Sequence, residues 1–509
     1  MTSTAATTRP VLVRSTVAAA AGLIAATAYP PFDLGVTIFV GLVPLVWLWR
    51  DASPSRAALY GFVWGFAFFG VVMYWIYFFG AVAFVPLMGA LAGTIALIGL
   101  VVALLRLAGA HSAWVTAAVW TLVEMARGRF PLGGLPWAEV GVALHDFPPA
   151  RALARWGGVP LVTFVAVALA GLIVSGFLAA RDRARGRGAQ PAIGIGILAL
   201  VTLAATLTIS APPATEELRF ALLQGNDLNR RLTAEEIEAD LITRKHVALA
   251  GTLRGNYDLI VFPESSFADD PQGDPVAESQ IERVARAHDA FVLMNGPTPA
   301  GDDREYNENL LYSPGGQVVG RYAKRHLVPF GEYVPLRDFV DWIPAVDQIT
   351  WNYEPGDEQT IFDIRGVPVA SVICFENAFA PLVRGAVRDG AEVLVVSTNN
   401  RSYRRSSNAA QHVALSQMRA AETGRPILHA SISGVTAVID EDGDVTQESE
   451  LFVNSVTEGT VTARGGQTPF VRYGAWAGWM SALILTVAGA IALRRRTENR
   501  PESLVDSTV

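Results

Sequence analysis

VPVASVICFENAF, residues 367–379, is the stretch around which the chain is organised, and it holds the only cysteine of the sequence. Residues 367–373 form a short apolar run rich in β-branched residues, which predicts a buried strand. Cys374 stands where that strand ends, two residues before the acid Glu376. Enzymes that combine strands and helices often place a nucleophile at such a strand end. A lone cysteine is also common as a small buried apolar residue, so this stretch alone leaves both interpretations open.

The composition divides the chain into membrane-like and soluble parts. Hydrophobic residues make up 51% of the 509 residues and charged residues only 17%, whereas about a quarter is usual in a soluble protein. The apolar sequence is concentrated in residues 11–211 and returns at 473–493, while residues 216–465 resemble a soluble domain. The net charge of −7 and the lack of a basic patch argue against nucleic-acid binding. A single cysteine excludes an internal disulfide and a Cys/His zinc cluster.

Apolar runs of about 20 residues are long enough to cross a bilayer. The sequence predicts seven spans before the soluble domain and one after it, of which the second and fifth are short. They lie at residues 11–29, 35–50, 57–79, 81–105, 112–126, 158–180, 191–211 and 473–493. We therefore expect a transmembrane domain over 1–211, a catalytic domain over 216–465, a C-terminal transmembrane helix over 473–493 and a cytoplasmic tail over 494–509.

The positions of the arginines predict the orientation of these spans, because arginine is enriched in cytoplasmic loops. Loops on the same side as the N-terminus contain Arg50, Arg56, Arg106, Arg181, Arg183, Arg185, Arg187 and Arg494 to Arg496. This side is therefore predicted to be cytoplasmic, which places the soluble domain outside the cytoplasmic membrane.

The loop 127–157 is an exception, with Arg127, Arg129, Arg151 and Arg155 on the outer side. These arginines indicate a structured, functional loop, with contact to lipid headgroups as one role. The alternative is that the short fifth span is wrongly assigned.

Residues 218–465 alternate short apolar runs with amphipathic stretches. Strands are predicted at 218–224, 258–264, 291–296, 367–374 and 391–397, with further strand signal at 427–440. Two stretches, 233–253 and 275–289, carry apolar residues at the three- and four-residue spacing of amphipathic helices. This alternation predicts an α/β layer structure with a central sheet.

Three reactive residues fall at places where chemistry could assemble. Glu264 follows the strand LIVFP, Lys324 lies in the Pro-, Gly- and aromatic-rich segment YAKRHLVPFGEYVP, and Cys374 ends its strand. Acyl transfer by a cysteine needs a thiolate, a base and a cation for the developing oxyanion. These three side chains supply those parts, although a strand-end Glu or a loop Lys taken alone is usually just solvated.

The segments around these residues resemble the catalytic motifs of a known superfamily. VFPES (261–265), KRHLVPFGEYVP (324–335) and VICFEN (372–377) are similar to the three motifs of the nitrilase superfamily, whose members use a Glu-Lys-Cys triad. The second motif resembles that of its membrane-bound branch, the apolipoprotein N-acyltransferases. Further segments with the character of this family are 30–48, 120–137, 306–312, 411–426 and 468–474, so the resemblance covers nearly the whole chain.

The resemblance implies a multi-span α-helical membrane domain plus an extracytoplasmic α/β nitrilase-like domain, which is an αββα sandwich. It also implies a role for each residue of the triad. Cys374 would be the nucleophile, Glu264 the general base, and Lys324 the group that stabilises the tetrahedral intermediates.

Four further residues take supporting or substrate-binding roles by the same resemblance. Glu332 and Glu376 match two more acids of the family, although a loop carboxylate and a strand-end ion-pair partner are the ordinary alternatives. Backbone N–H groups near Phe375 would complete the oxyanion hole, and Asn307 lies in the family-like segment YNENLLY. No metal and no cofactor is expected.

The chain departs from the family pattern in two places. Many members carry a Trp-Phe-Gly segment after the counterpart of VSTNN (396–400), whereas this chain has Arg401, Tyr403, Arg404 and Arg405 there. These arginines are interpreted either as a solvated loop or as a contact for anionic headgroups. A tryptophan common after the first strand is also missing from 224–236.

By resemblance, the enzyme would move an acyl chain from a membrane phospholipid onto Cys374 and then onto the N-terminal amine of a diacylglyceryl-cysteine lipoprotein. The expected location is the cytoplasmic membrane, with several spans and the catalytic domain on the outer side. One alternative is a membrane-tethered nitrilase-type amidase that hydrolyses small amides. Another is a non-catalytic scaffold for a partner membrane enzyme, and anchoring such a partner is also compatible with catalysis.

Overall fold

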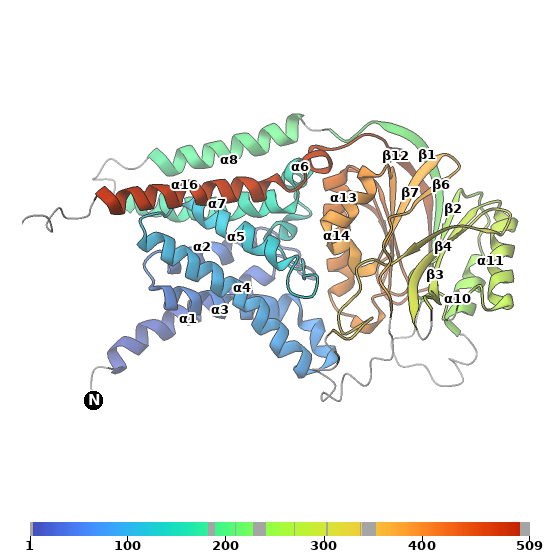
Figure 1. The fold of residues 1–509 in the computed structure, drawn as a ribbon, viewed down its shortest axis with the longest axis horizontal. Helices are drawn as coiled ribbons and strands as arrows, with labels where there is room; N and C mark the ends of the chain where they lie inside the picture. Colours follow the sequence, from blue (N-terminus) through green and yellow to red (C-terminus); the bar gives the residue numbers. More distant parts are fainter. Residues whose placement is uncertain are drawn as a thin grey trace, which may run out of the picture.

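The structure is a computed structural model, which describes residues 4–181, 189–208, 210–226, 241–268, 270–301, 304–335, 337 and 353–498. A helical part and a part built of two sheets lie side by side along the longest axis (Figure 1). The chain passes from the helices into the sheets and returns to the helices at its C-terminal end.

The helical part consists of long apolar helices joined by short loops. Its helices are α1 (Thr4–Ala26), α2 (Thr37–Trp49), α3 (Pro54–Val72), η1 (Tyr74–Phe79), α4 (Ala81–Leu107), α5 (Ala113–Arg127), η2 (Val140–Leu144), α6 (Pro148–Gly157), α7 (Val159–Arg181), α8 (Ala189–Thr208), α15 (Pro469–Tyr473) and α16 (Trp476–Glu498). Among the described residues, α3, α4, α7, α8 and α16 are long and apolar enough to cross a membrane. The apolar helices within α1 and α2 are shorter.

One predicted span differs from the structure in its second half. The third span was expected to run over 57–79, but α3 ends at Val72 and residues 74–79 form the 3₁₀ helix η1. Met73 has left the helical conformation, and five of the six residues of η1 are aromatic. Aromatic side chains lose rotamer freedom in a helix, so a continuous apolar run does not guarantee a continuous helix.

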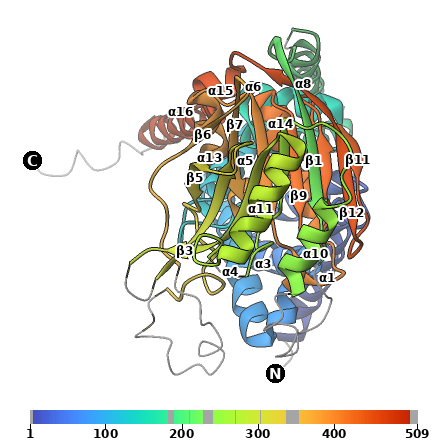
Figure 2. The ribbon, with the colours of Figure 1, turned by 90° about the vertical axis from the view of Figure 1, so that its right-hand side faces the viewer.

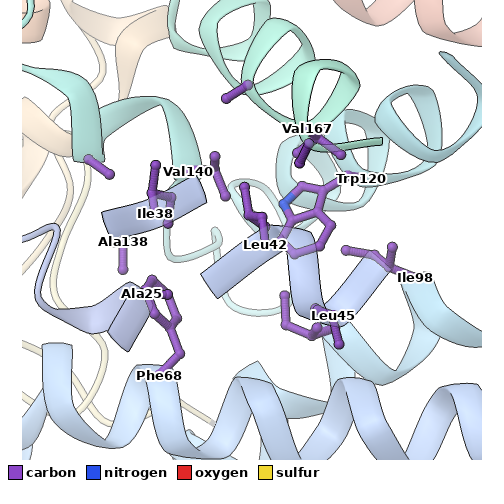
Figure 3. Packing of buried hydrophobic residues seen from close by; sticks show 14 of the residues in the cluster. Ala25, Ile38, Leu42, Leu45, Phe68, Ile98, Trp120, Ala138, Val140 and Val167 are labelled. Carbon is purple, nitrogen blue, oxygen red and sulfur yellow. The ribbon is translucent and has the colours of Figure 1, made fainter. Parts of the chain in front are cut away.

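The helices pack closely around Trp120, which is fully buried between residues of several helices (Figure 3). Its ring approaches those of Trp49 and Trp64 to within about 6 Å between centroids. Between α3 and α4, glycine permits close contact of the backbones: a Cβ on Gly61 would lie 2.5 Å from the carbonyl oxygen of Ile95. Small residues have this role in many membrane helix pairs.

The second part contains two six-stranded sheets. The first has the order β12-β1-β2-β3-β4-β5, with β12 (Ser455–Arg464), β1 (Ala214–Gln224), β2 (Leu259–Val261), β3 (Phe291–Pro299), β4 (Glu305–Tyr312) and β5 (Val318–Ala323). The second has the order β11-β10-β9-β8-β7-β6, with β11 (Val445–Glu448), β10 (Ala437–Ile439), β9 (Ile427–Ser431), β8 (Val393–Thr398), β7 (Val367–Ile373) and β6 (Ile361–Ile364).

The two sheets face each other across a hydrophobic core and carry helices on their outer faces. Phe220 and Val261 of the first sheet and Val369 and Val395 of the second belong to one buried cluster. The helices α10 (Leu241–Ala250) and α11 (Pro275–His288) cover the first sheet and face the viewer in Figure 2, while α13 (Ala380–Arg388) and α14 (Asn408–Thr423) cover the second. This αββα sandwich confirms the predicted fold class.

Strands are found at all the predicted positions, 218–224, 258–264, 291–296, 367–374, 391–397 and 427–440. However, β2 is only three residues long, and the stretch 427–440 forms two antiparallel strands, β9 and β10. The predicted helix 275–289 is α11, and the second half of the predicted helix 233–253 is α10. The first half of that helix lies outside the described residues, as do Arg183, Arg185, Arg187, residues 499–509 and most of the segment that lacks the tryptophan.

The layer formed by α13 and α14 is the one that faces the helical part (Figure 1). Gln411 of α14 makes the most extensive connection across this boundary. Its Nε2 donates to the carbonyl oxygens of Pro30 (3.2 Å) and Val72 (2.8 Å), and its Oε1 accepts from the indoles of Trp75 (3.2 Å) and Trp137 (2.8 Å). Because both parts meet at buried, directional contacts, the sheets sit on the helices in a defined orientation.

Arg151 and Arg155 of the loop 127–157 take part in the same boundary, so the loop is structured as expected, and these two arginines contact protein groups rather than headgroups. Arg127, Arg151 and Arg155 are each about 5% exposed. Arg151 pairs with Asp444, and Arg155 pairs with Asp442 at 2.7 Å. These two pairs bind the sheets to the helices, whereas Arg127 donates to the carbonyl oxygen of Trp137 within the helical part. Of this set of four arginines, Arg129 is the exposed one.

Candidate active site

The catalytic cysteine candidate occupies a strained turn at the end of β7. Cys374 has φ +51°, a left-handed conformation that non-glycine residues rarely adopt, and it begins the short 3₁₀ helix η5 (Cys374–Ala378). Such outliers are maintained only when the surroundings enforce them, and they gather at functional sites. The turn directs the side chain out of the strand and leaves it partly exposed.

The surroundings that enforce this turn include a histidine that the sequence analysis did not identify. The Nε2 atom of His412, on α14, lies 3.0 Å from the carbonyl oxygen of Cys374, and its Nδ1 atom lies 3.2 Å from the hydroxyl oxygen of Thr398. Burial lowers the pKa of His412 to about 4, so the ring is neutral at physiological pH. The signal for His412 was its place in QHVALSQMR, a segment noted only as family-like.

Glu264 and Lys324 come together from two strands of the other sheet. Glu264 lies in the loop after β2, and Lys324 follows β5 directly. The Lys324 Nζ atom is 3.2 Å from Glu264 Oε1 and 2.8 Å from Glu332 Oε1. The Lys324 side chain is 1% exposed, so this is a buried cation held by two carboxylates.

Asn307 of β4 holds the two carboxylates in place. Its Nδ2 donates to Glu264 Oε1 and to Glu332 Oε1, at 2.9 Å in each case. Its own Oδ1 accepts from Asn295 Nδ2 at 2.8 Å. Glu332 is further fixed by the backbone N–H of Val328, at 2.8 Å from Oε2. The structure therefore brings Glu332 and Asn307, two of the expected supporting residues, into direct contact with the Glu–Lys pair.

Burial and the neighbouring charges together raise the pKa of both the lysine and the cysteine. Burial alone would lower the pKa of Lys324, but Glu264 and Glu332 outweigh it and raise the pKa well above its ordinary value. Burial, together with the charge of Glu264, raises the pKa of Cys374 to about 12, against the opposing effect of Lys324. At neutral pH the site thus contains a protonated lysine and a neutral thiol, which needs a base before it can attack.

Glu376 has a structural position rather than one facing the lysine. Its Oε1 accepts from the backbone N–H groups of Arg325 (2.7 Å) and His326 (3.0 Å). Its Oε2 accepts from Tyr322 Oη (2.9 Å) and from the N–H of Ile373 (2.8 Å). Glu376 is fully buried. Its hydrogen bonds connect the segment after Lys324 with the strand that ends at the cysteine.

Aromatic side chains connect the cysteine turn with the helical part. Phe375 packs edge-on against Phe379, and both belong to the apolar cluster formed by the long helices. Tyr403, in η6 (Arg401–Tyr403), packs edge-on against Trp75 and Phe79 of the 3₁₀ helix η1. The turn at Cys374 therefore lies against the helices expected to span the membrane, rather than on an open face of the sandwich.

The segment 401–405 is accordingly not a simple solvated loop. The Arg404 guanidinium lies 5.0 Å from the ring centroid of Phe78, and that of Arg405 lies 5.2 Å from the ring of Phe452. Both contacts have cation–π geometry. In place of an aromatic segment, this chain thus presents a tyrosine flanked by arginines toward the aromatic residues of η1.

Comparison with known proteins agrees with this architecture. Residues 21–172 match the apolipoprotein N-acyltransferase N-terminal domain, and residues 220–469 match the carbon–nitrogen hydrolase family. The apolipoprotein N-acyltransferase of Nitrosomonas europaea is 32% identical over 501 residues, covering 94% of this chain and 98% of that protein. The chain belongs to the apolipoprotein N-acyltransferase family. It is therefore an enzyme of the acyltransferase class with a carbon–nitrogen hydrolase domain.

One further relative agrees with membership of the apolipoprotein N-acyltransferase family. The member from Azotobacter vinelandii is 31% identical over 525 residues, covering 96% of this chain and 97% of that protein. Among solved structures, an amidase from Nesterenkonia sp. is similar to 52% of this chain and 95% of its own, with a TM-score of 0.37 and 19% identity.

Proposed function

We propose that this apolipoprotein N-acyltransferase moves a fatty acyl chain from a membrane phospholipid to the N-terminal α-amine of a diacylglyceryl-cysteine lipoprotein, through a thioester on Cys374. The observation that carries the proposal is the position of the cysteine turn. The buried Glu264–Lys324 pair is close enough to Cys374 to act on its charge, and Phe375 and Phe379 connect the turn with the apolar cluster of the long helices. A water-soluble substrate would not require an apolar cluster of membrane-type helices next to the cysteine.

In the first half-reaction, Glu264 takes the proton of the neutral Cys374 thiol as the sulfur attacks the ester carbonyl carbon of the donor. Lys324 and backbone N–H groups near Phe375 stabilise the oxyanion that forms. The carbon–oxygen ester bond then breaks, and Glu264 returns the proton to the leaving glycerol oxygen. The products are the acyl thioester and a lysophospholipid.

In the second half-reaction, the neutral α-amine of the acceptor attacks the thioester carbonyl carbon. Glu264 takes a proton from the amine, and Lys324 again stabilises the oxyanion. The carbon–sulfur bond breaks, and the proton passes to the cysteine sulfur. The amide-linked acyl chain leaves with the lipoprotein, and the enzyme returns to its starting state without a metal or a cofactor.

The supporting residues act through these groups. Glu332 and Asn307 fix Lys324 and Glu264 in register with each other, because each contacts at least one of them within 3 Å. Glu376 positions the segment after Lys324 relative to the cysteine turn. All three are positioning residues, since none of their contacts involves the cysteine sulfur.

The proposal includes the arrangement of the chain in the membrane. Residues 1–211 and 473–493 form the transmembrane part, 216–465 the catalytic domain, and 494–509 a cytoplasmic tail. The arginine distribution supports a catalytic domain on the extracytoplasmic side of the cytoplasmic membrane. Both lipid substrates would then reach the site from the outer leaflet. The same membrane would also allow a partner membrane enzyme to associate with this chain.

Intact mass spectrometry tests this function directly. The purified full-length protein is incubated with phospholipid vesicles, and wild type is compared with Cys374→Ser and Cys374→Ala. We expect wild type to gain the mass of one acyl group that neutral hydroxylamine removes, and Cys374→Ala to gain none. An oxygen ester on Cys374→Ser would still place acylation at this position.

Three results would contradict the proposal. Acyl label on another residue would refute the assignment of Cys374. No adduct together with hydrolysis of small amides would favour the tethered amidase. No adduct and no hydrolysis would favour the scaffold.

A further inference from the structure

A second cluster of potential ligands lies on the other side of α14, away from Cys374. Asp33, in the loop before α2, and His145 and Asp146, in the loop after η2, bring one imidazole nitrogen and two carboxylate oxygens within 4.8 Å of one another. His145 Nε2 lies 3.6 Å from Asp33 Oδ1 and 3.7 Å from Asp146 Oδ2. These two distances are longer than a hydrogen bond.

The imidazole is buried and points into this cluster. His145 is 5% exposed, and in the described part of the chain its ring makes no hydrogen bond. Two ligands of one tetrahedral zinc ion stand roughly 3.3–3.6 Å apart, because the metal–ligand bonds are about 2.0–2.2 Å long. The observed spacings therefore suit two oxygens and a nitrogen around a shared cation better than they suit direct hydrogen bonds.

The space in front of the cluster is strongly acidic. A cavity of about 440 Å³ is lined by Asp33, Asp146, Asp444 and Glu448 as well as His145, and no lysine or arginine is among the described residues that line it. A concave surface with one sign of charge concentrates counter-ions. A cation in this cavity would face an open coordination position that water could fill.

Neighbouring groups already orient the ligands. Gln417 Nε2 of α14 donates to Asp146 Oδ1 at 3.0 Å, which leaves Oδ2 directed at the histidine. The Arg151 guanidinium donates to the carbonyl oxygen of His145 at 3.2 Å and also pairs with Asp444. The contact of Gln417 with the Asp146 carboxylate is of the kind that orients ligands in metal sites, while Arg151 fixes the backbone of His145.

We propose that Asp33, His145 and Asp146 bind one divalent transition-metal cation of the zinc type at the boundary between the helices and the sheets. An imidazole with two carboxylates favours such a cation over magnesium or calcium, which prefer oxygen ligands alone. The bound cation joins two loops of the helical part and, through Gln417, holds them against α14. It has no part in the acyl transfer, so this site and the proposed function stand or fall separately.

The test uses the full-length protein, without a polyhistidine tag, in detergent micelles. Metal is removed with a chelator, zinc sulfate is added, and excess zinc is removed before the metal content is measured by mass spectrometry. We expect about one zinc per chain in wild type and in the control His111→Ala, which removes an exposed histidine. We expect His145→Ala to weaken zinc binding by at least about tenfold.

Two further measurements distinguish loss of the metal site from loss of folding. Asp146→Asn changes an exposed carboxylate and should fold even if His145→Ala does not, and it should weaken zinc binding too. Cobalt(II) in place of zinc should give visible absorption bands that are absent in both variants. Substoichiometric zinc, or equal zinc in wild type and both variants, would overturn the site and show adventitious binding only.

Discussion

Lys324 is the residue whose environment is most demanding, because its ammonium group is buried between two carboxylates. Glu264, Glu332 and Asn307 are arranged around it at 2.8–3.2 Å or share its partners. Removing one member of a buried charge cluster leaves the others uncompensated, which costs far more than the net contribution of the pair. The site thus couples catalysis to stability at a single side chain.

Substituting Lys324→Met should therefore abolish acylation and also destabilise the fold. We expect a loss of about 3–5 kcal/mol, because Glu264 and Glu332 would face each other in a buried site without a cation. Thermal unfolding of the detergent-solubilised protein measures the effect. The control is Arg286→Met, which removes an exposed arginine from its partly exposed partner Glu282 on α11 and should cost under about 1 kcal/mol. Equal shifts in both variants would contradict the buried cluster.

The cysteine should react as a neutral thiol. Burial and the charge of Glu264 raise its pKa to about 12, so below that pH the thiolate fraction increases about tenfold with each pH unit. The rate of alkylation by iodoacetamide should accordingly keep rising between pH 7 and pH 10, while that of a free cysteine derivative levels off above about pH 9. A plateau near pH 7 would instead indicate a stable thiolate and remove the need for Glu264 as the base of the first step.

At this scale, the sequence motifs were enough to propose Glu264, Lys324 and Cys374 as site residues, and the fold was needed for the rest. Asn295 and His412 act by contacts to residues far away in the chain, and neither is charged at neutral pH. Polar residues of this kind have no spacing that distinguishes them from ordinary surface residues. Only the assembled sheets show that Asn295 positions Asn307, and that His412 holds the carbonyl of the strained cysteine.

Among the elements, α14 connects the two parts of the molecule. One of its residues, His412, contacts the cysteine turn, and its neighbour Gln411 inserts its amide among four groups of the helical part. The amide is buried, so water cannot replace those partners. The position of the cysteine relative to the helices consequently depends in part on this amide.

Gln411→Met keeps the volume but removes all four contacts. Two indole N–H groups and two carbonyls would lose a buried partner, at about 1–3 kcal/mol for each group that finds no other. We expect a loss of at least about 3 kcal/mol in thermal stability and lower acyl transfer. Gln317→Met, on the exposed turn between β4 and β5, is the control and should change neither. A variant as stable as this control would show that Gln411 is not essential for docking.

The element boundaries show where sequence patterns were informative. Buried strands such as β7 and β8 could be predicted, because continuous β-branched runs between polar segments have few alternatives. The end of α3 could not, because hydropathy measures whether a segment is apolar and not whether its backbone is helical. The buried arginines of 127–157 were misassigned for a related reason: charge alone does not distinguish a guanidinium at a headgroup from one paired with Asp442 or Asp444.

For the whole molecule, the main prediction concerns the side of the membrane. Two single-cysteine variants in a Cys374→Ser background, Gln317→Cys and Ser55→Cys, report on the catalytic domain and on the first turn of α3. In intact cells a membrane-impermeant maleimide should label Gln317→Cys, provided the reagent crosses any outer envelope, and leave Ser55→Cys unlabelled. After the cells are opened, both should be labelled. The reverse pattern would invert the proposed orientation.

The two connections of the catalytic domain to the helices have a mechanical consequence. β1 and β12 are antiparallel neighbours, and Ala214, near the entry of the chain, is paired with Arg464, near its exit. Both tethers therefore leave from one corner of the domain, where the Arg155–Asp442 pair also lies, because Glu441, beside Asp442, pairs with Arg464. The contacts of Gln411 with Pro30 and Val72 are a separate connection between the domain and the helices. Loss of the Gln411 contacts would leave the domain attached at this corner, and Cys374 would be free to move away from the helices against which its turn packs.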